Sequence, residues 1–390
     1  MRETELVDAA PGRLVPYGQR SYYRPNPLPP VRDLDLDETF YDLLSDATYQ
    51  LGRLSGLGQT TDFAPVLYTS LLRKEAIESA EIEGANVDFT ALYSAETRAR
   101  SASDGSEARG EARGARTASA GVGATKDTRE VLNYERAVED GIDALRRGEE
   151  ITVELLHALH ETLLVDVPPE RRETDTLGEF LLPAPEVIDG LMDALLTYVR
   201  TGGRYHPLIN VALAHYQFET IHPYGDGNGH LGRLLTTLQL HDEGYLERPT
   251  FYLSEYFNRN KRTYIDRMEA VRTTGAWEDW LEFFLTGIER QARESIDRSL
   301  ELRELHERYE DRYGEVTHAY ARLARRLFEN PYFTASEAAE MLDVERTTAY
   351  RAIRTLEAEG VLEEVTGNER YQEFRATEIF AILERPPRTY

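Results

Sequence analysis

The chain contains 390 residues, of which 41% are hydrophobic, and its formal net charge is −25. This length allows two or three domains with apolar cores, and the lack of cysteine excludes disulfides, thiolate catalysis and thiolate metal sites. No apolar run reaches the roughly eighteen residues that cross a bilayer, and the start lacks the apolar segment of a signal peptide. We therefore expect a cytoplasmic protein without a membrane partner.

The charged residues are mostly acidic, and lysine is rare. Acidic residues number 70 against 45 basic ones, and only three of the basic residues are lysines. Such a surface stays solvated in molar salt, where screening reduces self-repulsion, and we interpret it as halophilic. An acidic protein from a GC-rich genome would share this composition. In both cases the charge disfavours nucleic acid as a bulk electrostatic partner.

The N-terminal part, residues 1–96, is predicted to be an extended arm followed by helices. The arm ends in the proline-rich segment Pro25–Pro30. One helix is predicted between Pro65, which suits a first turn, and Gly84, which suits a helix end. Residues 97–126 are rich in Gly, Ser, Ala and Arg and hold a single large apolar residue. They cannot bury enough surface to offset their ordering entropy, which predicts a disordered insertion.

Helical patterns continue from residue 127 to residue 330, with almost no strand signal. The last sixty residues, 331–390, are expected to form a separate unit. Thr334 and Glu337 predict a capping box, and a second helix and a hairpin follow, which is the winged-helix order. The expected fold is therefore mainly α, with a helical core, an N-terminal helical region and a small C-terminal winged-helix α+β domain.

One glycine-rich segment, His222–Arg233, reads HPYGDGNGHLGR. Its glycines match the dinucleotide-binding fingerprint, but the residues before it have helical and not strand spacing, which disfavours that fold. The glycines allow successive backbone N–H groups to face an anion at the start of the next helix. This arrangement predicts a cradle for phosphate.

The polar residues of the segment suit transfer of a phosphate-containing group. Asp226 offers a hard oxygen to Mg²⁺, and Arg233 points from the same helix face as Gly229 toward a bound phosphate. His222 can remove a proton from a hydroxyl near neutral pH. A base, a metal carboxylate, an anion cradle and a guanidinium together predict phosphoryl or nucleotidyl transfer.

At these residues the sequence resembles the Fic family, whose signature is H-x-F-x-(D/E)-G-N-G-R-x-x-R. The resemblance spans residues 25–290 apart from the insertion, and it assigns residues 127–300 to the Fic catalytic core, with linking helices at 301–330. It implies ATP as donor, Mg²⁺ as cofactor, and a Ser, Thr or Tyr hydroxyl of a protein as acceptor. The target is not identified, and the chain itself is one candidate.

The resemblance also assigns roles by position. His222 would be the base and Asp226 the metal ligand, while Arg233 would bind the γ-phosphate. The predicted ATP site contains Gly227, Asn228, Gly229, His230, Leu231, Gly232, Arg233, Tyr264 and Glu83.

A second element of the family, the inhibitory motif (S/T)-x-x-x-E-(G/N), is matched by Ser79–Gly84, SAEIEG. By resemblance, Ser79, Glu83 and Gly84 are its defining positions. Glu83 would pair with Arg233 and keep ATP from binding productively, since a carboxylate paired with a guanidinium competes directly with phosphate. The alternative interpretation is an exposed acidic helix end.

Two features depart from the family. His230 replaces the first arginine of the signature, and the segment between Gly178 and Pro185, where relatives carry a flap that docks the target peptide, is short. Other histidines, at positions 160, 215 and 241, lie in predicted helices and are interpreted as packed side chains and not ligands.

Three functions remain open. The first is transfer of AMP to a protein, the second is AMP removal or transfer of another phosphate-containing group, and the third is transcriptional regulation with a nucleotide-sensing core. His222 and Asp226 favour chemistry, because a sensor needs neither a base nor a metal ligand. Residues 331–390 hold seven arginines and twelve acids, so DNA binding and protein binding, including a homodimer, are both open for that domain.

Overall fold

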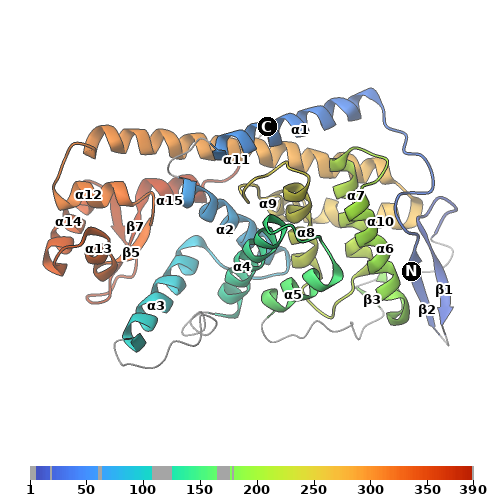
Figure 1. The fold of residues 1–390 in the computed structure, drawn as a ribbon, viewed down its shortest axis with the longest axis horizontal. Helices are drawn as coiled ribbons and strands as arrows, with labels where there is room; N and C mark the ends of the chain where they lie inside the picture. Colours follow the sequence, from blue (N-terminus) through green and yellow to red (C-terminus); the bar gives the residue numbers. More distant parts are fainter. Residues whose placement is uncertain are drawn as a thin grey trace.

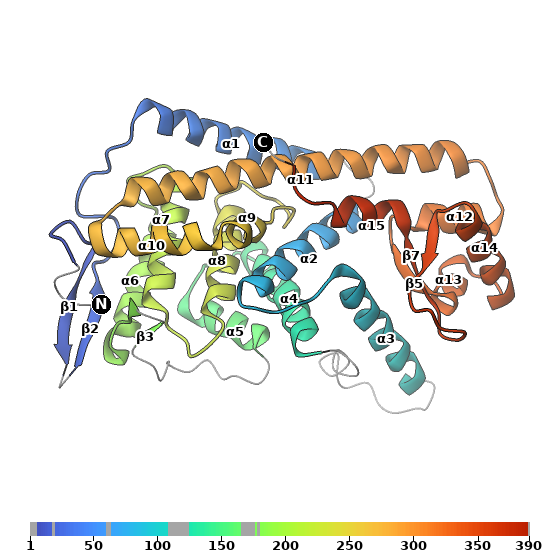
Figure 2. The ribbon, with the colours of Figure 1, turned by 180° about the vertical axis from the view of Figure 1, so that it is seen from behind.

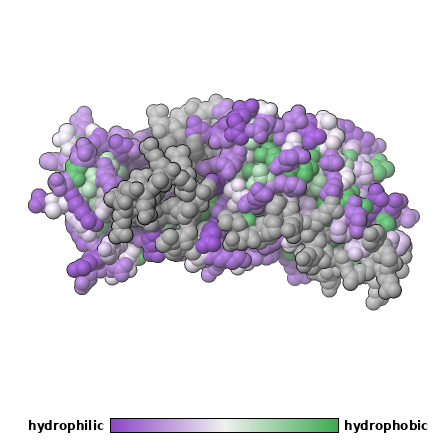
Figure 3. Space-filling model, turned by 60° about the horizontal axis from the view of Figure 1, so that its bottom comes forward, coloured by the Kyte–Doolittle hydropathy of each residue, from purple (hydrophilic) through white to green (hydrophobic). Residues whose placement is uncertain are grey.

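The computed structural model describes residues 6–17, 20–59, 64–107, 125–164, 176–177 and 180–388. It is mainly helical, as expected, with small sheets at the two ends of the molecule (Figure 1). No helix within these ranges combines the length and the apolar character needed to cross a bilayer. On the face shown in Figure 3, hydrophilic residues cover most of the coloured surface, in line with the acidic composition.

The N-terminal arm contains a hairpin, so the prediction of an arm without regular structure is wrong for these residues. Strands β1 (Gly12–Tyr17) and β2 (Arg20–Pro25) pair antiparallel. Tyr22 and Tyr23 are buried, and the Tyr23 ring lies 5.1 Å from the Arg272 guanidinium. The hairpin is thus stabilised by packing on distant helices, which its proline-rich surroundings did not reveal.

Two long helices lie side by side along one edge of the molecule in both ribbon views (Figures 1 and 2). They are α1 (Glu38–Gln59) and α11 (Trp277–Tyr313). Leu44, Ala47, Leu51 and Leu54 of α1 are buried at helical spacing, which gives α1 one apolar face toward α11. With 37 residues, α11 is about 55 Å long and joins the core to the C-terminal unit.

The remaining core consists of helices around a central pair, α7 and α8. Almost every residue of this pair is buried, which explains the absence of a polar face in the sequence of α7. The core helices are α2 (Ala64–Ile82), α4 (Lys126–Arg146), α5 (Val153–Leu163), α6 (Ile188–Thr201), α7 (Pro207–Ile221), α8 (Asn228–Asp242), α9 (Ser254–Arg259) and α10 (Lys261–Thr274). Short strands β3 (Thr176–Leu177) and β4 (Phe180–Leu181) and the 3₁₀ turn η3 (Pro185–Val187) precede α6.

Helix α3 (Phe89–Glu107) corrects part of the predicted insertion. Residues 97–107 are helical and not disordered. Phe89 and Tyr93 are buried and start the helix, and alanine and arginine then continue it at low cost. Residues 108–124 lie outside the described residues, as do residues 178–179 of the segment in which the short flap was predicted. The described residues on either side of 178–179 form the antiparallel pair β3–β4.

The C-terminal unit has the predicted order of helix, helix and hairpin. Its three strands pair antiparallel in the order β5–β7–β6, and the capping box at Thr334 and Glu337 is formed. Its elements are α12 (Ala319–Arg326), β5 (Tyr332–Thr334), α13 (Ala335–Leu342), α14 (Arg346–Ala358), β6 (Leu362–Glu364), β7 (Glu373–Ala376) and α15 (Thr377–Glu384).

This unit is not separate from the core. The ring of Tyr93 on α3 stacks on Tyr332 at 5.9 Å and lies 5.4 Å from Phe380. One continuous set of buried apolar side chains includes residues of α2 to α4 and of the C-terminal unit. The helix that carries the inhibitory motif therefore shares a core with the C-terminal unit.

Candidate active site

The glycine-rich loop joins the central helices α7 and α8. His222 ends α7 with a positive φ of 51°, which turns the chain out of the helix. The Asn228 side chain fixes the loop from both sides, since its Oδ1 accepts from the Tyr224 N–H and its Nδ2 donates to the Tyr224 carbonyl, both at 2.9 Å. Gly227 adopts φ 74°, a conformation that favours glycine.

His160 of α5 contacts the loop and stabilises its conformation. Its Nε2–H donates to the Asp226 carbonyl oxygen at 2.9 Å, and its ring stacks on Tyr224 at 3.9 Å. Burial lowers the pKa of His160, so the ring is neutral and its proton lies on Nε2. The sequence predicted a packed histidine here, and the structure agrees, but its contact with the loop had no sequence signal.

The first turn of α8 holds a carboxylate. A Cβ on Gly229 would lie 2.2 Å from Glu83 Oε1, so the absence of a side chain at Gly229 makes room for that oxygen. Free backbone N–H groups and the helix dipole favour an anion at this position. Glu83 therefore occupies the place in which the sequence predicted phosphate to bind.

Arg233, one turn further along α8, contacts the same carboxylate. Its Nη2 lies 2.9 Å from Glu83 Oε1 and 3.1 Å from the Ser79 carbonyl, and its Nε donates to Ser79 Oγ at 2.8 Å. The Arg233 side chain is 3% exposed and that of Glu83 45%. Partial burial acts to raise the pKa of Glu83, but Arg233 outweighs it, so the pKa lies below its ordinary value.

His230 joins this cluster through Ser79. Its Nδ1 lies 3.0 Å from Ser79 Oγ, and because the Arg233 Nε can only donate, the Ser79 hydroxyl proton is available to His230 Nδ1. Burial, assisted by Arg233, lowers the pKa of His230 to about 3. The imidazole is therefore neutral in this arrangement, and the structure brings Ser79, Glu83, His230 and Arg233 together.

Other predicted nucleotide residues lie farther from solvent. Leu231 is fully buried in the core. The Tyr264 hydroxyl lies 2.8 Å from His215 Nε2, and its ring stacks on Phe257 at 4.7 Å within a large aromatic cluster. The roles of Leu231 and Tyr264 with ATP stay predictions. Gly84, a predicted inhibitory position, is exposed and has φ 100° after the end of α2.

Helix α2, which carries Ser79 and ends directly before Glu83, is held against α9 and α10 by polar contacts that the sequence did not predict. Glu75 is buried and accepts from the Ser254 N–H at 2.9 Å, and Asn258 donates to both Glu78 and Glu81. Lys261 Nζ donates to the Ile82 carbonyl at 2.6 Å. These contacts hold Glu83 at the start of α8.

Asp226 can hold a metal ion only together with other ligands. It is exposed, and its Oδ1 accepts from the Gly227 N–H at 2.8 Å, which leaves Oδ2 for a cation. Within the described residues, no three His, Asp or Glu side chains cluster closely enough to bind a metal by themselves. Mg²⁺ suits such a site, because it commonly takes one carboxylate and completes its shell with phosphate oxygens and water.

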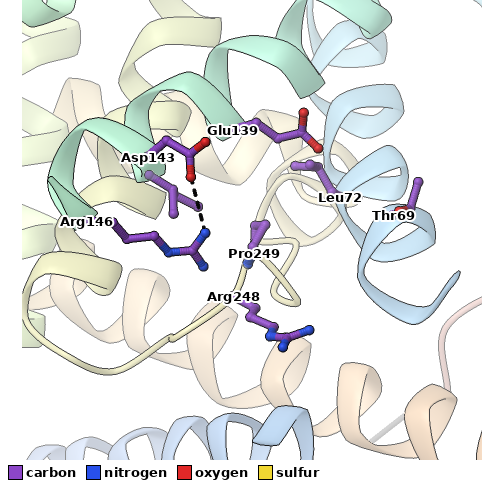
Figure 4. Close-up of a pocket in the computed structure, with 8 residues that line it drawn as sticks. Thr69, Leu72, Glu139, Asp143, Arg146, Arg248 and Pro249 are labelled. Carbon is purple, nitrogen blue, oxygen red and sulfur yellow. Dashed lines mark hydrogen bonds and ion pairs between the residues drawn. The ribbon is translucent and has the colours of Figure 1, made fainter. Parts of the chain in front are cut away.

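A cavity of about 550 Å³ lies apart from the loop, between α2, α4 and the segment after α8 (Figure 4). In Figure 4, Arg146 pairs with Asp143, at 3.3 Å. The residues that line the cavity are Thr69, Leu72, Glu139, Ile142, Asp143, Arg146, Arg248 and Pro249. None belongs to either sequence motif, so the candidate chemistry lies at the loop and not in this cavity.

Comparison with known proteins gives a consistent assignment. The model of the Fic/DOC family N-terminal region matches residues 41–143, and that of the Fic/DOC family matches residues 150–240. The protein adenylyltransferase Fic of Drosophila ananassae is 32% identical over 123 residues, which are 30% of this chain and 25% of that protein. A probable protein adenylyltransferase of Aquifex aeolicus is 29% identical over 125 residues, 30% of this chain and 39% of that protein.

The likeness to these two relatives is thus confined to less than half of their length. A solved structure extends the comparison of the fold. The crystal structure of a Fic family protein from Desulfovibrio desulfuricans G20 superposes with a TM-score of 0.52 at 20% identity, over 88% of this chain and 97% of that one. With two matching family models, adenylyltransferase relatives and a shared fold, the chain belongs to the Fic/Doc family.

Proposed function

We propose that this chain transfers AMP from ATP to a Ser, Thr or Tyr hydroxyl of a protein, and that Glu83 restrains the reaction. The observation that carries the proposal is the position of the Glu83 carboxylate, which contacts Arg233 and lies against Gly229 at the start of α8. An anion site with one guanidinium and a helix start suits a phosphate chain. The adenylyltransferase names of the relatives support the same chemistry.

In this reaction, the α8 start and Arg233 would hold the phosphates of ATP. His222 would take the proton of the acceptor hydroxyl, whose oxygen forms a bond to the α-phosphorus while the bond to the bridging oxygen breaks and pyrophosphate leaves. Asp226 would hold Mg²⁺, which supplies charge neutralisation to the phosphates. His222 lies at the end of α7, directly before the loop, and we assign this role to it from that position.

Glu83 would act as a competitor of phosphate. While its carboxylate is bound to Arg233, the terminal phosphate of ATP cannot bind that guanidinium. The α-phosphate is then not aligned for attack by the acceptor hydroxyl. Partial exposure of Glu83 means that it can leave the site, whereas Arg233 is held inside the core. Activation would then require a movement of Glu83 together with the end of α2.

Intact-mass spectrometry after incubation with ATP and Mg²⁺ in high salt tests the proposal. We expect AMP adducts on the Glu83→Gly variant, few on the wild type, and none on Glu83→Gly/His222→Ala. A parallel incubation with a known AMP-modified protein separates AMP addition from AMP removal. Absence of any adduct on the variant and on cytosolic proteins supplied with labelled ATP would reject AMP transfer.

The partner of the C-terminal unit is a second point. Arg346 and Arg351 of α14 are exposed, as DNA contacts would require, but the unit is acidic overall. We propose that this unit binds a protein, with a second copy of this chain among the candidates. An electrophoretic mobility shift of duplex DNA by the protein at low salt would contradict this proposal.

A further inference from the structure

Helix α7 carries a second acidic residue near the anion site, and neither motif includes it. Glu219 lies three residues before His222, and its carboxylate faces α8, because a Cβ on Gly232 would lie 2.2 Å from Glu219 Oε1. This oxygen is shielded from solvent and has no hydrogen-bond partner within the described residues. A buried carboxylate oxygen without a donor is costly as an ion.

The ionisable groups around Glu219 come from three neighbouring segments. Arg233 follows Gly232 on α8, Glu83 reaches the same guanidinium from the turn after α2, and the Tyr264 hydroxyl faces the cluster from α10. On α7 itself, His215 contacts that hydroxyl and is fully buried. The Arg233 guanidinium thus contacts the Glu83 carboxylate directly and attracts that of Glu219 electrostatically, and two neighbouring carboxylates do not both ionise readily.

The protonation of Glu219 follows from this arrangement. Burial raises its pKa, Arg233 opposes the rise, and the Glu83 charge adds to it, which places the pKa of Glu219 at about 7. While Glu83 is bound to Arg233, Glu219 is therefore mostly protonated below about pH 7. When Glu83 leaves, its repulsion is lost, and Glu219 releases the proton more readily.

We propose that Glu219 is a positioning residue for Arg233, which pairs with the guanidinium as a carboxylate when the anion site is empty and takes up a proton when a phosphate or Glu83 occupies it. This inference rests on the proposed nucleotide binding. Glu219 holds Arg233 in place between the inhibited and the loaded states. It also couples nucleotide binding to uptake of one proton.

The sign of the coupling follows from the proton balance. Ionised Glu219 and phosphate compete for Arg233, so binding consumes a proton, and higher pH weakens it. Between the pKa of Glu219 in the empty enzyme and its higher pKa in the occupied one, affinity should fall by up to about tenfold per pH unit through this group. A variant that cannot ionise at this position should lose that slope.

Isothermal titration calorimetry on Glu83→Gly and Glu83→Gly/Glu219→Gln measures the coupling. The probe is an ATP analogue with a methylene between its α- and β-phosphates. It is titrated into each protein in the presence of Mg²⁺, in buffers of different ionisation enthalpy. We expect Glu83→Gly to take up more protons than the double variant near pH 7, and to bind more weakly as pH rises through this range. The ionisation of the analogue itself cancels in the difference between the two variants.

Two outcomes overturn the inference. The first is equal proton uptake and equal pH dependence in both variants, with nucleotide bound to each. The second is loss of the uptake in Glu83→Gly/His230→Gln with its retention in the Glu219→Gln double variant, which would assign the proton to the imidazole. Rescue of the pH dependence in Glu83→Gly/Glu219→Asp would support a carboxylate at this position.

A readout without nucleotide separates this inference from the proposed function. Infrared difference spectra between each protein and its Glu219→Gln variant isolate the carboxyl band of Glu219. We expect a protonated carboxyl in the wild type at pH 6 and a lower titration midpoint in Glu83→Gly. An ionised Glu219 at pH 6, or an unchanged midpoint, rejects the inference even if no nucleotide binds, whereas failure of nucleotide binding with the expected midpoints rejects only the proposed function.

Discussion

Ser79 accepts two hydrogen bonds from Arg233, one at its hydroxyl at 2.8 Å and one at its backbone carbonyl at 3.1 Å. The guanidinium is therefore held by the body of α2 as well as by Glu83. Glu83 contributes one contact from a partly exposed side chain, while Ser79 is fully buried. Release of Arg233 thus involves a shift of α2 in addition to a change of rotamer at Glu83.

Replacing Ser79 with alanine should relieve part of the restraint. The Arg233 Nε then loses its acceptor, and a hydrogen bond to a charged group is worth roughly 1.5–3 kcal/mol. We expect AMP transfer by Ser79→Ala to lie between that of the wild type and that of Glu83→Gly, measured as incorporation of labelled AMP. Ser70→Ala is the matched control, since Ser70 is also buried on α2 but contacts Tyr93, and it should stay at the wild-type level.

Removal of the Glu83 carboxylate should raise AMP transfer by about 10²-fold or more, the scale of a misplaced reacting group. Glu83→Asp should act partially, because the shorter side chain reaches Arg233 less well. Arg233→Ala should abolish transfer and should not be rescued by Glu83→Gly, because the same guanidinium serves the inhibited and the active states. Equal incorporation by the wild type and Glu83→Gly would leave Ser79–Gly84 as a helix end only.

Gly229→Ala should weaken nucleotide binding even without Glu83. Its Cβ would lie 2.2 Å from Glu83 Oε1 and 2.8 Å from Arg233 Nη1, so it fills the space of an anion at the start of α8. We expect a clear loss of affinity for the ATP analogue in Glu83→Gly/Gly229→Ala relative to Glu83→Gly. Gly190→Ala on α6, where a Cβ meets no atom within 4 Å, should bind as its parent does. Unchanged affinity in the Gly229 variant would place the phosphates elsewhere.

The Glu83–Arg233 pair should contribute to stability over most of the pH range. The pKa of Glu83 lies below its ordinary value of 4.5, so its contribution is present above the unfolded value and is lost as pH falls through the folded one. The difference in Tm between the protein and its Glu83→Gln variant should therefore be constant from about pH 8 to 5 and shrink only at lower pH. Both proteins should carry Glu219→Gln, which removes the other titrating carboxylate. A difference that declines already between pH 7 and 6 would contradict the assignment.

The sequence was most informative where structure is set locally. The loop after His222 could be predicted because glycines and Asn228 determine its conformation within a few residues, and the capping box at Thr334 is equally local. The contact between Glu83 and Arg233, 150 residues apart, came from the resemblance and not from the residues themselves.

Features that depend on distant packing were missed. The β1–β2 hairpin is held by Tyr23 against Arg272, and α3 extends through a stretch whose composition indicates disorder. The role of Glu219 could not be predicted from the sequence, because an acidic residue within a helix is normally expected at the surface. Only the fold shows that Gly232 packs against it. Long-range contacts of this kind are not encoded in any short window of sequence.

Arg298 of α11 forms hydrogen bonds with residues that are synthesised much later than itself. Its side chain is fully buried, and it donates to the carbonyls of Ile382, Leu383 and Arg385. Ile382 follows Arg298 by 84 residues, so during synthesis this guanidinium lacks that acceptor until the ribosome has added those residues. Residues 382–385 therefore complete the hydrogen bonding of a side chain on α11. A protein shortened before Ile382 would leave the two Nη groups of this buried guanidinium without these acceptors, while Glu294 and Tyr252 would still contact its Nε.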